Sequence, residues 1–160
     1  MPELEIRDAT EEDAPLILSL IRELAEYERL SHEVVATEKA LRDWLFGERR
    51  VAEVLLGYLG DDPAGFALFF HNFSTFLGMP GIYLEDLYVR PEFRGAGIGR
   101  ALLVHLANVA RERGCGRLEW SVLDWNEPAI GFYRSIGATP VSGWTVYRVS
   151  GGALEELAGL

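Results

Sequence analysis

Two adjacent carboxylates interrupt an otherwise apolar segment near the middle of the chain. Residues 81–89 read GIYLEDLYV, so Glu85 and Asp86 lie where a strand is predicted. Successive side chains of a strand point to opposite faces, so only one of these acids can easily face a substrate unless a β-bulge intervenes. The alternative is a pair of strand acids that surface arginines neutralise.

A cationic, glycine-rich loop follows directly. Residues 90–100 read RPEFRGAGIGR, with three arginines and three strictly alternating glycines. This spacing fits neither a P-loop nor a dinucleotide-binding fingerprint. A loop that can adopt positive φ before a helix N-terminus offers free amides to an anion, and Arg94, Arg100 and Arg90 are candidates to add positive charge. The sequence therefore predicts a phosphate or pyrophosphate site; tight packing is the alternative reason for the glycines.

The charge of the whole chain is opposite to that of the loop. Its 160 residues include 25 acids and 15 bases, for a formal net charge of −10. Such a surface repels the phosphate backbone of nucleic acids and attracts small cations, although it can also serve solubility alone. The histidines are scattered without metal-ligand spacing and Cys115 is the single cysteine, so we expect neither a metal site nor an internal disulfide.

The hydrophobic pattern predicts one mixed α/β domain over residues 1–160. Thr10 and Asp13 are expected to begin a helix that ends near residue 28, and Thr37 to cap a shorter one. A further helix is expected from Ile98 to Gly114, another over 126–138, and a turn or two within 151–160. Strands are expected at 4–9, 51–60, 64–73, 81–89, 117–125 and 143–149.

The N-terminal residues, MPELEIRDATEEDAPL, have acids where a signal peptide needs a basic start. No window of the sequence approaches the length and apolarity of a membrane-spanning helix. We therefore expect a cytoplasmic protein.

The pattern Arg94-x-x-Gly97-x-Gly99 resembles the acyl-CoA pyrophosphate signature of the GNAT superfamily of N-acetyltransferases, and the predicted order of elements matches that superfamily. Other stretches resemble its spermidine/spermine acetyltransferase family, most of all the thialysine acetyltransferase branch: ATEKALRDWLF, FSTF, YLEDLYVRPEFRGAGIG, VLDWNEPAIGFY and GW. The similarity covers nearly the whole chain. It implies an α/β (mixed) GNAT fold with a central, mostly antiparallel sheet and helices on both faces.

The resemblance also implies a function. Members of this family transfer an acetyl group from acetyl-CoA to the primary amine of a small cationic substrate, which is a thialysine- or lysine-like amino acid, a diamine or a polyamine. The resemblance further implies direct transfer in a ternary complex, and a homodimer without a metal. The matching Glu85 would contact the amine and remove its proton through water, and Tyr133 would donate a proton to the CoA sulfur.

Further site residues follow from the resemblance. The backbone of Leu87, Tyr88 and Val89 would pair with the pantetheine arm of CoA. The other matching cofactor positions are Arg94, Gly95, Ala96, Gly97, Ile98, Gly99, Arg100, Asn126, Glu127, Pro128 and Ala129. The matching positions on the amine side are Tyr27, Glu28, Ser74, Glu85, Glu119, Trp120, Ser121 and Ser142.

Amine acetylation requires a proton acceptor, because an alkyl amine with a pKa near 10.4 is mostly charged at pH 7 and its free base costs about 4.6 kcal/mol to present. A carboxylate beside an ammonium stabilises the charged form, so Glu85 could bind the amine better than it deprotonates it. A tyrosine with a pKa of about 10 is protonated at pH 7 and suits Tyr133 as a donor.

The amine side departs from the polyamine pattern, since Ser74 and Ser142 occupy positions where the polyamine enzymes have acids. Fewer carboxylates favour a lysine-like amino acid or a short diamine over a long polyamine. Three alternatives remain open: a GNAT enzyme that acts on a protein amine or an aminoglycoside, a non-catalytic acyl-CoA sensor, and a nucleotide-binding protein built on the glycine loop.

Overall fold

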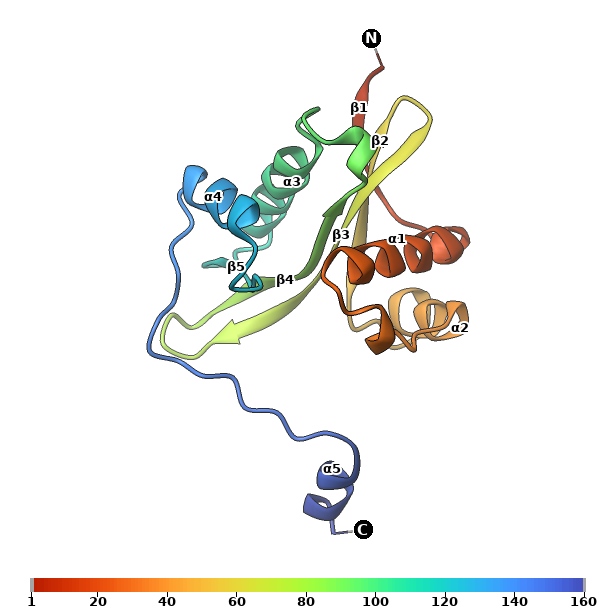
Figure 1. The fold of residues 1–160 in the computed structure, drawn as a ribbon. Helices are drawn as coiled ribbons and strands as arrows, with labels where there is room; N and C mark the ends of the chain where they lie inside the picture. The colour runs from red at the N-terminus through yellow and green to blue at the C-terminus, as the bar shows by residue number, and fades with distance from the viewer. Residues whose placement is uncertain (1, 160) are drawn as a thin grey trace. The chain divides into compact units, whose positions relative to one another are not determined.

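The computed structural model describes residues 2–159, which divide into two units between Leu123 and Asp124. A five-stranded sheet forms the centre of the first unit (Figure 1). Its strands lie side by side in chain order: β1 (Leu4–Asp8), β2 (Glu53–Leu59), β3 (Asp62–Ser74), β4 (Met79–Val89) and β5 (Leu118–Trp120). The first four are antiparallel neighbours and β5 runs parallel to β4, which confirms a mostly antiparallel sheet.

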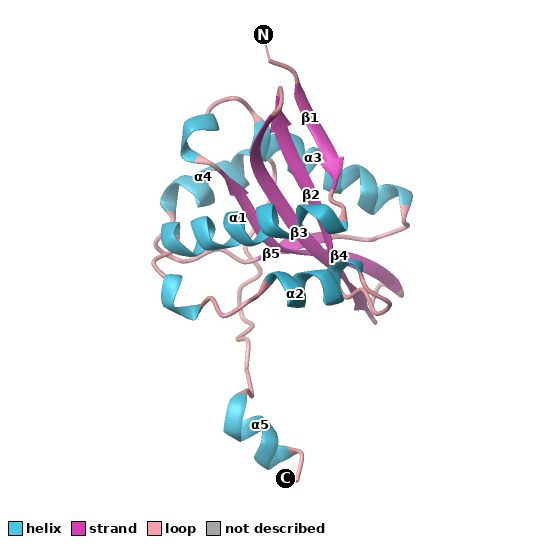
Figure 2. Cartoon of the chain, turned by 90° about the vertical axis from the view of Figure 1, so that its right-hand side faces the viewer, coloured by secondary structure: helices cyan, strands magenta, loops and turns pink. Residues whose placement is uncertain are grey.

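Helices cover both faces of this sheet, as predicted. α1 (Ala14–Tyr27) and the short α2 (Glu38–Leu41) lie on one face, and α3 (Ile98–Glu112) lies on the other (Figures 1 and 2). A 3-10 turn at residues 11–13 precedes α1, and there the Thr10 amide donates to the Asp13 carboxylate at 2.8 Å. α2 continues into a π-turn at Arg42–Phe46. No helix within residues 2–159 is both long and apolar enough to span a bilayer.

α1 is amphipathic, and its apolar side packs against the sheet to form a core. Ile17 and Leu20 are fully buried on α1, and they belong to one cluster with Leu56 of β2, Phe66 of β3 and Tyr88 of β4. Spacing of three and four residues brings the apolar side chains of α1 onto one side of the helix, where they cover the sheet. α1 is thereby held over the sheet.

The predicted strand at 117–125 is shorter in the structure, where β5 ends at Trp120. Trp120 pairs with Leu84, and the next residue of β4 is displaced by a bulge. Because a bulge bends its strand and interrupts the ladder, the parallel pairing ends there.

The second unit contains α4 (Glu127–Ser135) and α5 (Gly151–Leu157), which confirms a helix after Asn126 and helical turns in the tail. The prediction of a last strand at 143–149 is wrong, since these residues form no strand. β-branched and aromatic residues favour an extended chain, but a strand also needs a hydrogen-bonding neighbour. Among the residues described, this segment has none.

Candidate active site

A β-bulge in β4 brings Glu85 and Asp86 to the same face of the sheet. Asp86 pairs with Leu68 of β3, whereas Phe69, the next residue of β3, pairs with Leu84. Glu85 is therefore the extra residue of β4, opposite no residue of its own. The prediction allowed for a bulge at this pair of acids, and the structure contains one.

The side on which the acids lie follows from their neighbours. Phe69 faces α3, since the Arg113 guanidinium after that helix lies 5.9 Å from its ring centre. Its partner Leu84 lies on the same face of the sheet. Because successive side chains of a strand point to opposite faces, Glu85 lies on the face covered by α1. Leu68 packs against the core beneath α1, and Asp86 opposite it lies on that face as well. Both acids thus lie on the α1 face.

Glu85, Asp86 and Glu28 form a group of like charges, which we call the carboxylate cluster. Asp86 is half-buried, and burial first, then the negative charges of Glu85 and Glu28, raise its pKa to about 6. Glu28 directly follows α1, and burial raises the pKa of its carboxyl too. A concentration of negative charge of this kind favours a cation and disfavours an anion. Within residues 2–159 no His, Cys, Asp and Glu side chains group in a way that could hold a metal ion.

Residues of β5 lie beside β4 just before the bulge. Glu119 pairs with Tyr83, and the Tyr83 hydroxyl shares a 2.6 Å hydrogen bond with the Ser121 hydroxyl. Glu119 is already engaged, because it accepts from the Asn72 amide at 3.3 Å and lies 3.6 Å from the Arg117 guanidinium. The structure therefore brings residues 119–121 next to the start of the bulge.

Ser74 lies elsewhere in the fold. It ends β3, six residues beyond Leu68, which at about 3.3 Å per residue corresponds to roughly 20 Å along the strand. Its side chain is buried, and the hydroxyl accepts from the Leu77 amide at 3.1 Å in the β3–β4 turn. Within this chain the Ser74 hydroxyl stabilises the β3–β4 turn, and Ser74 is not next to the carboxylate cluster.

One edge of β4 is open after the bulge. The pairing with β5 covers Ile82 to Leu84 only, while β3 occupies the other edge through Val89. Among residues 2–159, no strand pairs with this edge over 85–89. The backbone there retains donors and acceptors that an extended ligand can use.

The glycine loop has the backbone geometry that the sequence predicts. Gly95 and Gly97 have φ of 87° and 83°, in the left-handed region that favours glycine. Gly97 is the N-cap of α3, and no side chain caps this helix end. Ile98 is buried to 1% exposure, so its side chain serves the core and only its backbone can contribute to binding, whereas Arg100 is exposed.

Arg94 links this loop to the end of α1. Its Nε donates to the Val89 carbonyl at 3.1 Å, and its guanidinium lies 5.0 Å from the ring centre of Tyr27 and 6.0 Å from that of Tyr88. Such cation–π contacts are attractive. Arg94 thus connects the glycine loop, which is predicted to bind CoA, with Tyr27, which is predicted to bind the amine.

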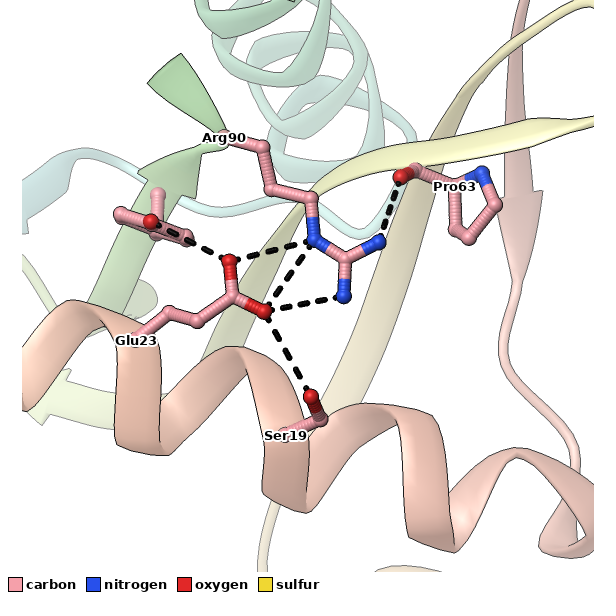
Figure 3. A network of polar contacts seen from close by, with 5 residues as sticks. Ser19, Glu23, Pro63 and Arg90 are labelled. Atoms are coloured by element: carbon pink, nitrogen blue, oxygen red, sulfur yellow. Dashed lines mark hydrogen bonds and ion pairs between the residues drawn. The ribbon is translucent and has the colours of Figure 1, made fainter. Parts of the chain in front are cut away.

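Arg90 does not serve the loop as a free cation, which corrects the expectation that it adds charge there. Its guanidinium donates to both carboxylate oxygens of Glu23 on α1, at 2.9 to 3.2 Å, and to the Pro63 carbonyl at 3.1 Å (Figure 3). The Tyr88 hydroxyl also donates to Glu23, at 3.3 Å. Arg90 therefore fastens the end of β4 to α1 and to β3. Sequence reasoning missed Glu23, since nothing in its local pattern marks it.

The remaining predicted residues belong to the second unit. Asn126 is buried, and its side-chain oxygen accepts from the Ala129 amide at 3.4 Å, so it caps α4. Tyr133 is half-buried on α4, with its ring centre 5.7 Å from that of Phe132. Ser142 lies in the exposed segment that follows.

Residues 17–138 match the model of the acetyltransferase (GNAT) family. The chain belongs to this family. As a GNAT protein it is an N-acetyltransferase, of a family that uses acetyl-CoA as co-substrate. Both the predicted family and the predicted fold class are thereby confirmed.

Full-length GNAT relatives give the finer comparison. The chain is 44% identical over 165 aligned residues to thialysine N-epsilon-acetyltransferase of Bos taurus, with 96% of each protein covered. It is 34% identical to L-ornithine N5-acetyltransferase of Arabidopsis thaliana, with 95% of this chain and 86% of the relative covered. The structure of an integron cassette protein from V. cholerae superposes with a TM-score of 0.81 at 30% identity, over 97% of both chains.

Proposed function

We propose that this GNAT enzyme uses acetyl-CoA to acetylate the terminal primary amine of a small cationic substrate, a lysine-like amino acid or a short diamine, by direct transfer in a ternary complex. The carboxylate cluster carries this proposal. Glu85 and Asp86 lie on one face of the sheet beside an open strand edge, Glu28 at the end of α1 adds its charge to theirs, and uncompensated carboxylates select an ammonium. The likeness to a thialysine N-epsilon-acetyltransferase and an ornithine N5-acetyltransferase supports the choice, since both substrates are α-amino acids with a primary amine at the end of the side chain.

Acetyl-CoA would bind apart from the carboxylate cluster, at the glycine loop and the open edge of β4. The amides around Gly95 and Gly97 and the N-terminus of α3 would hold the pyrophosphate, with Arg94 and Arg100 supplying positive charge. The open edge at Leu87–Val89 would pair with the pantetheine arm, which carries amides of its own. The glycine loop is thus cationic and the carboxylate cluster is anionic, as two substrates of opposite charge require.

In direct transfer the neutral amine attacks the thioester carbonyl carbon, and the thiolate of CoA departs. A backbone amide at the open edge would stabilise the developing oxyanion. Tyr133 would donate a proton to the sulfur, since a tyrosine hydroxyl keeps its proton at neutral pH. The role of Tyr133, that of Asn126 to Ala129 on the cofactor side and that of Ser142 on the amine side all remain predictions.

The test is a comparison of initial rates with acetyl-CoA, read as released thiol. Thialysine, lysine, ornithine, putrescine, spermidine and a lysine-containing peptide are the substrates. We expect kcat/KM to be highest for one of the amino acids or putrescine. A higher value for the peptide than for every small amine would contradict the substrate class and favour a protein-modifying enzyme.

The sensor alternative has its own test. Tyr133→Phe should lower kcat about a hundredfold if this hydroxyl protonates the leaving thiolate. Equal turnover by the variant and the unmodified protein would contradict that role. Binding of acetyl-CoA without turnover of any amine would favour an acyl-CoA sensor.

The homodimer and the cytoplasmic location are also proposals. Val146 and Tyr147 are 88% and 92% exposed in a segment whose sequence favours a strand, and a second copy of the chain would give this segment a partner. Light scattering should then give about twice the 17.9 kDa chain mass, and Tyr147→Glu should shift it toward the monomer.

A further inference from the structure

We propose that Asp86 accepts the proton of the substrate ammonium, while Glu85, the acid that the family resemblance selects, binds that ammonium. This assignment rests on the proposed amine acetylation and names a further catalytic residue within the same site. It starts from the bulge, which presents two neighbouring carboxylates on one face of the sheet instead of on opposite faces.

The two carboxylates differ in their surroundings. Glu85 is exposed, whereas Asp86 is half-buried, lies opposite Leu68 of β3 and is near enough to Glu28, after α1, for their charges to interact. An exposed carboxylate stays ionised and keeps most of its hydration when it binds an ammonium, which suits a residue that attracts and orients the substrate. A partly desolvated carboxylate holds a negative charge less readily, which suits a residue that must become neutral by taking a proton.

The charges around Asp86 reinforce this difference. Glu85 acts on it from β4 and Glu28 from the end of α1, and β3 presents the apolar Leu68 opposite it. In the described part of the chain the charges that act on Asp86 are both negative. The resulting pKa of about 6 makes Asp86 about a hundredfold more basic than an ordinary aspartate, yet it is still mostly ionised at pH 7. General bases work best when their pKa lies near the working pH.

The proton balance of the step is complete. One N–H bond of the ammonium breaks, and a carboxylate oxygen of Asp86 takes the proton and becomes a neutral acid. The freed lone pair forms the C–N bond to the thioester carbonyl carbon, and the C–S bond breaks. The sulfur takes a proton from its donor, and the second proton lost by the nitrogen restores that donor. Asp86 then releases its proton to solvent.

The decisive variant is Asp86→Asn in the full chain, with thialysine and acetyl-CoA as substrates. We expect kcat at pH 7.5 to fall about a hundredfold while the Kd for CoA stays unchanged. We also expect the kcat/KM profile of the unmodified protein to fall below an inflection near pH 6, and this inflection to be lost in the variant. Asp86→Glu keeps a carboxylate and should retain an inflection.

Two further variants separate a catalytic role from a general effect of charge. Glu85→Gln should raise the KM for the amine more than it lowers kcat, and it should keep an acid inflection. Asp62→Asn, at the exposed start of β3, removes one negative charge six residues along β3 from Leu68 and should leave the profile unchanged.

Several results would overturn the assignment. If Asp86→Asn keeps kcat within about threefold and retains the inflection, Asp86 is not the acceptor. If Glu85→Gln loses the inflection and Asp86→Asn only raises KM, the two roles are exchanged. If Asp86→Asn does not bind CoA and Asp86→Glu loses the inflection, the assignment also fails. Absence of amine acetylation by the unmodified protein would overturn the proposed function itself, and this assignment with it.

Discussion

Arg90 and Asp86 lie four residues apart, yet the charge of Arg90 is paired with an opposite charge and that of Asp86 is not. Arg90 is matched by a carboxylate from α1 that contacts it through several hydrogen bonds, in a network that also includes a carbonyl and a tyrosine hydroxyl. Asp86 is only partly exposed and is surrounded by charges of its own sign. A matched charge holds the fold together, whereas an unmatched one costs stability and is retained where binding or chemistry needs it.

The largest effect on stability should come from breaking the matched pair. Arg90→Met leaves the half-buried Glu23 carboxylate without its partner, and we expect the free energy of unfolding to fall by about 2 kcal/mol. Urea denaturation at pH 7 measures this change. The control is Arg7→Met in the exposed pair between Arg7 and Glu5, which should lose far less. Equal losses in the two variants would contradict a special role for Arg90.

Removing the unmatched charge of Asp86 should increase the free energy of unfolding. The folded-state pKa of Asp86, about 6, lies above the ordinary value of 3.8, so the folded protein binds more protons between these values and loses stability as the pH rises through them. Asp86→Asn removes this cost. We expect the variant to be more stable than the unmodified protein by about 1 kcal/mol at pH 7, a value reduced for partial exposure, and the gain to vanish near pH 3.8.

Urea denaturation of both proteins across this pH range measures the difference. A variant that is less stable at pH 7, or a gain that does not depend on pH, would show that the charge of Asp86 is compensated in the fold.

Weaker effects should follow from changing the neighbours of Asp86. Glu85→Gln and Glu28→Gln each remove a negative charge that raises the pKa of Asp86, so both should lower that pKa. Glu85 acts more strongly than Glu28, and its replacement should have the larger effect. Carbon-13 NMR of the Asp86 carboxyl during a pH titration measures both. The reverse order would mean that α1 approaches Asp86 more closely than its own strand neighbour does.

The smallest effect concerns the backbone beside Glu28. Arg29 has a φ of 62°, in the left-handed region that is unfavourable for a residue with a Cβ. Arg29→Gly should therefore stabilise the protein by roughly 0.5 kcal/mol, measured by urea denaturation. Gly60→Ala, at a φ of 63° in the β2–β3 turn, is the matched control and should destabilise it. A loss of stability in Arg29→Gly would mean that the Arg29 side chain contributes more than its backbone costs.

Local patterns were sufficient for most of the fold. Apolar residues at three- and four-residue spacing predicted α1 and α3, and runs of apolar, β-branched and aromatic residues predicted β2, β3 and β4, because these signals lie within each element. The segment at 143–149 shows the limit of such signals. Its β-branched and aromatic residues favour an extended chain, while strand formation depends on a partner that no local pattern specifies.

The site shows the same limit. The sequence showed that Glu85 and Asp86 interrupt an apolar strand, but the bulge that places them on one face depends on which β3 residue each opposes. The sequence also marked Arg90 as a cation, but its partner Glu23 lies 67 residues earlier. Pairings over such distances are decided by tertiary packing. Sequence spacing alone therefore predicted that Arg90 adds charge to the glycine loop, whereas it pairs with Glu23.

The open edge of β4 also bears on aggregation. An unpaired strand edge is a template on which another chain can add a strand and begin to aggregate. Here the edge is short, with the bulge at Glu85 before it and Pro91, which has no amide hydrogen, soon after it. Bulges and prolines are both devices that block strand addition. The edge thus stays long enough for a small extended ligand and too short for a neighbouring chain to extend the sheet.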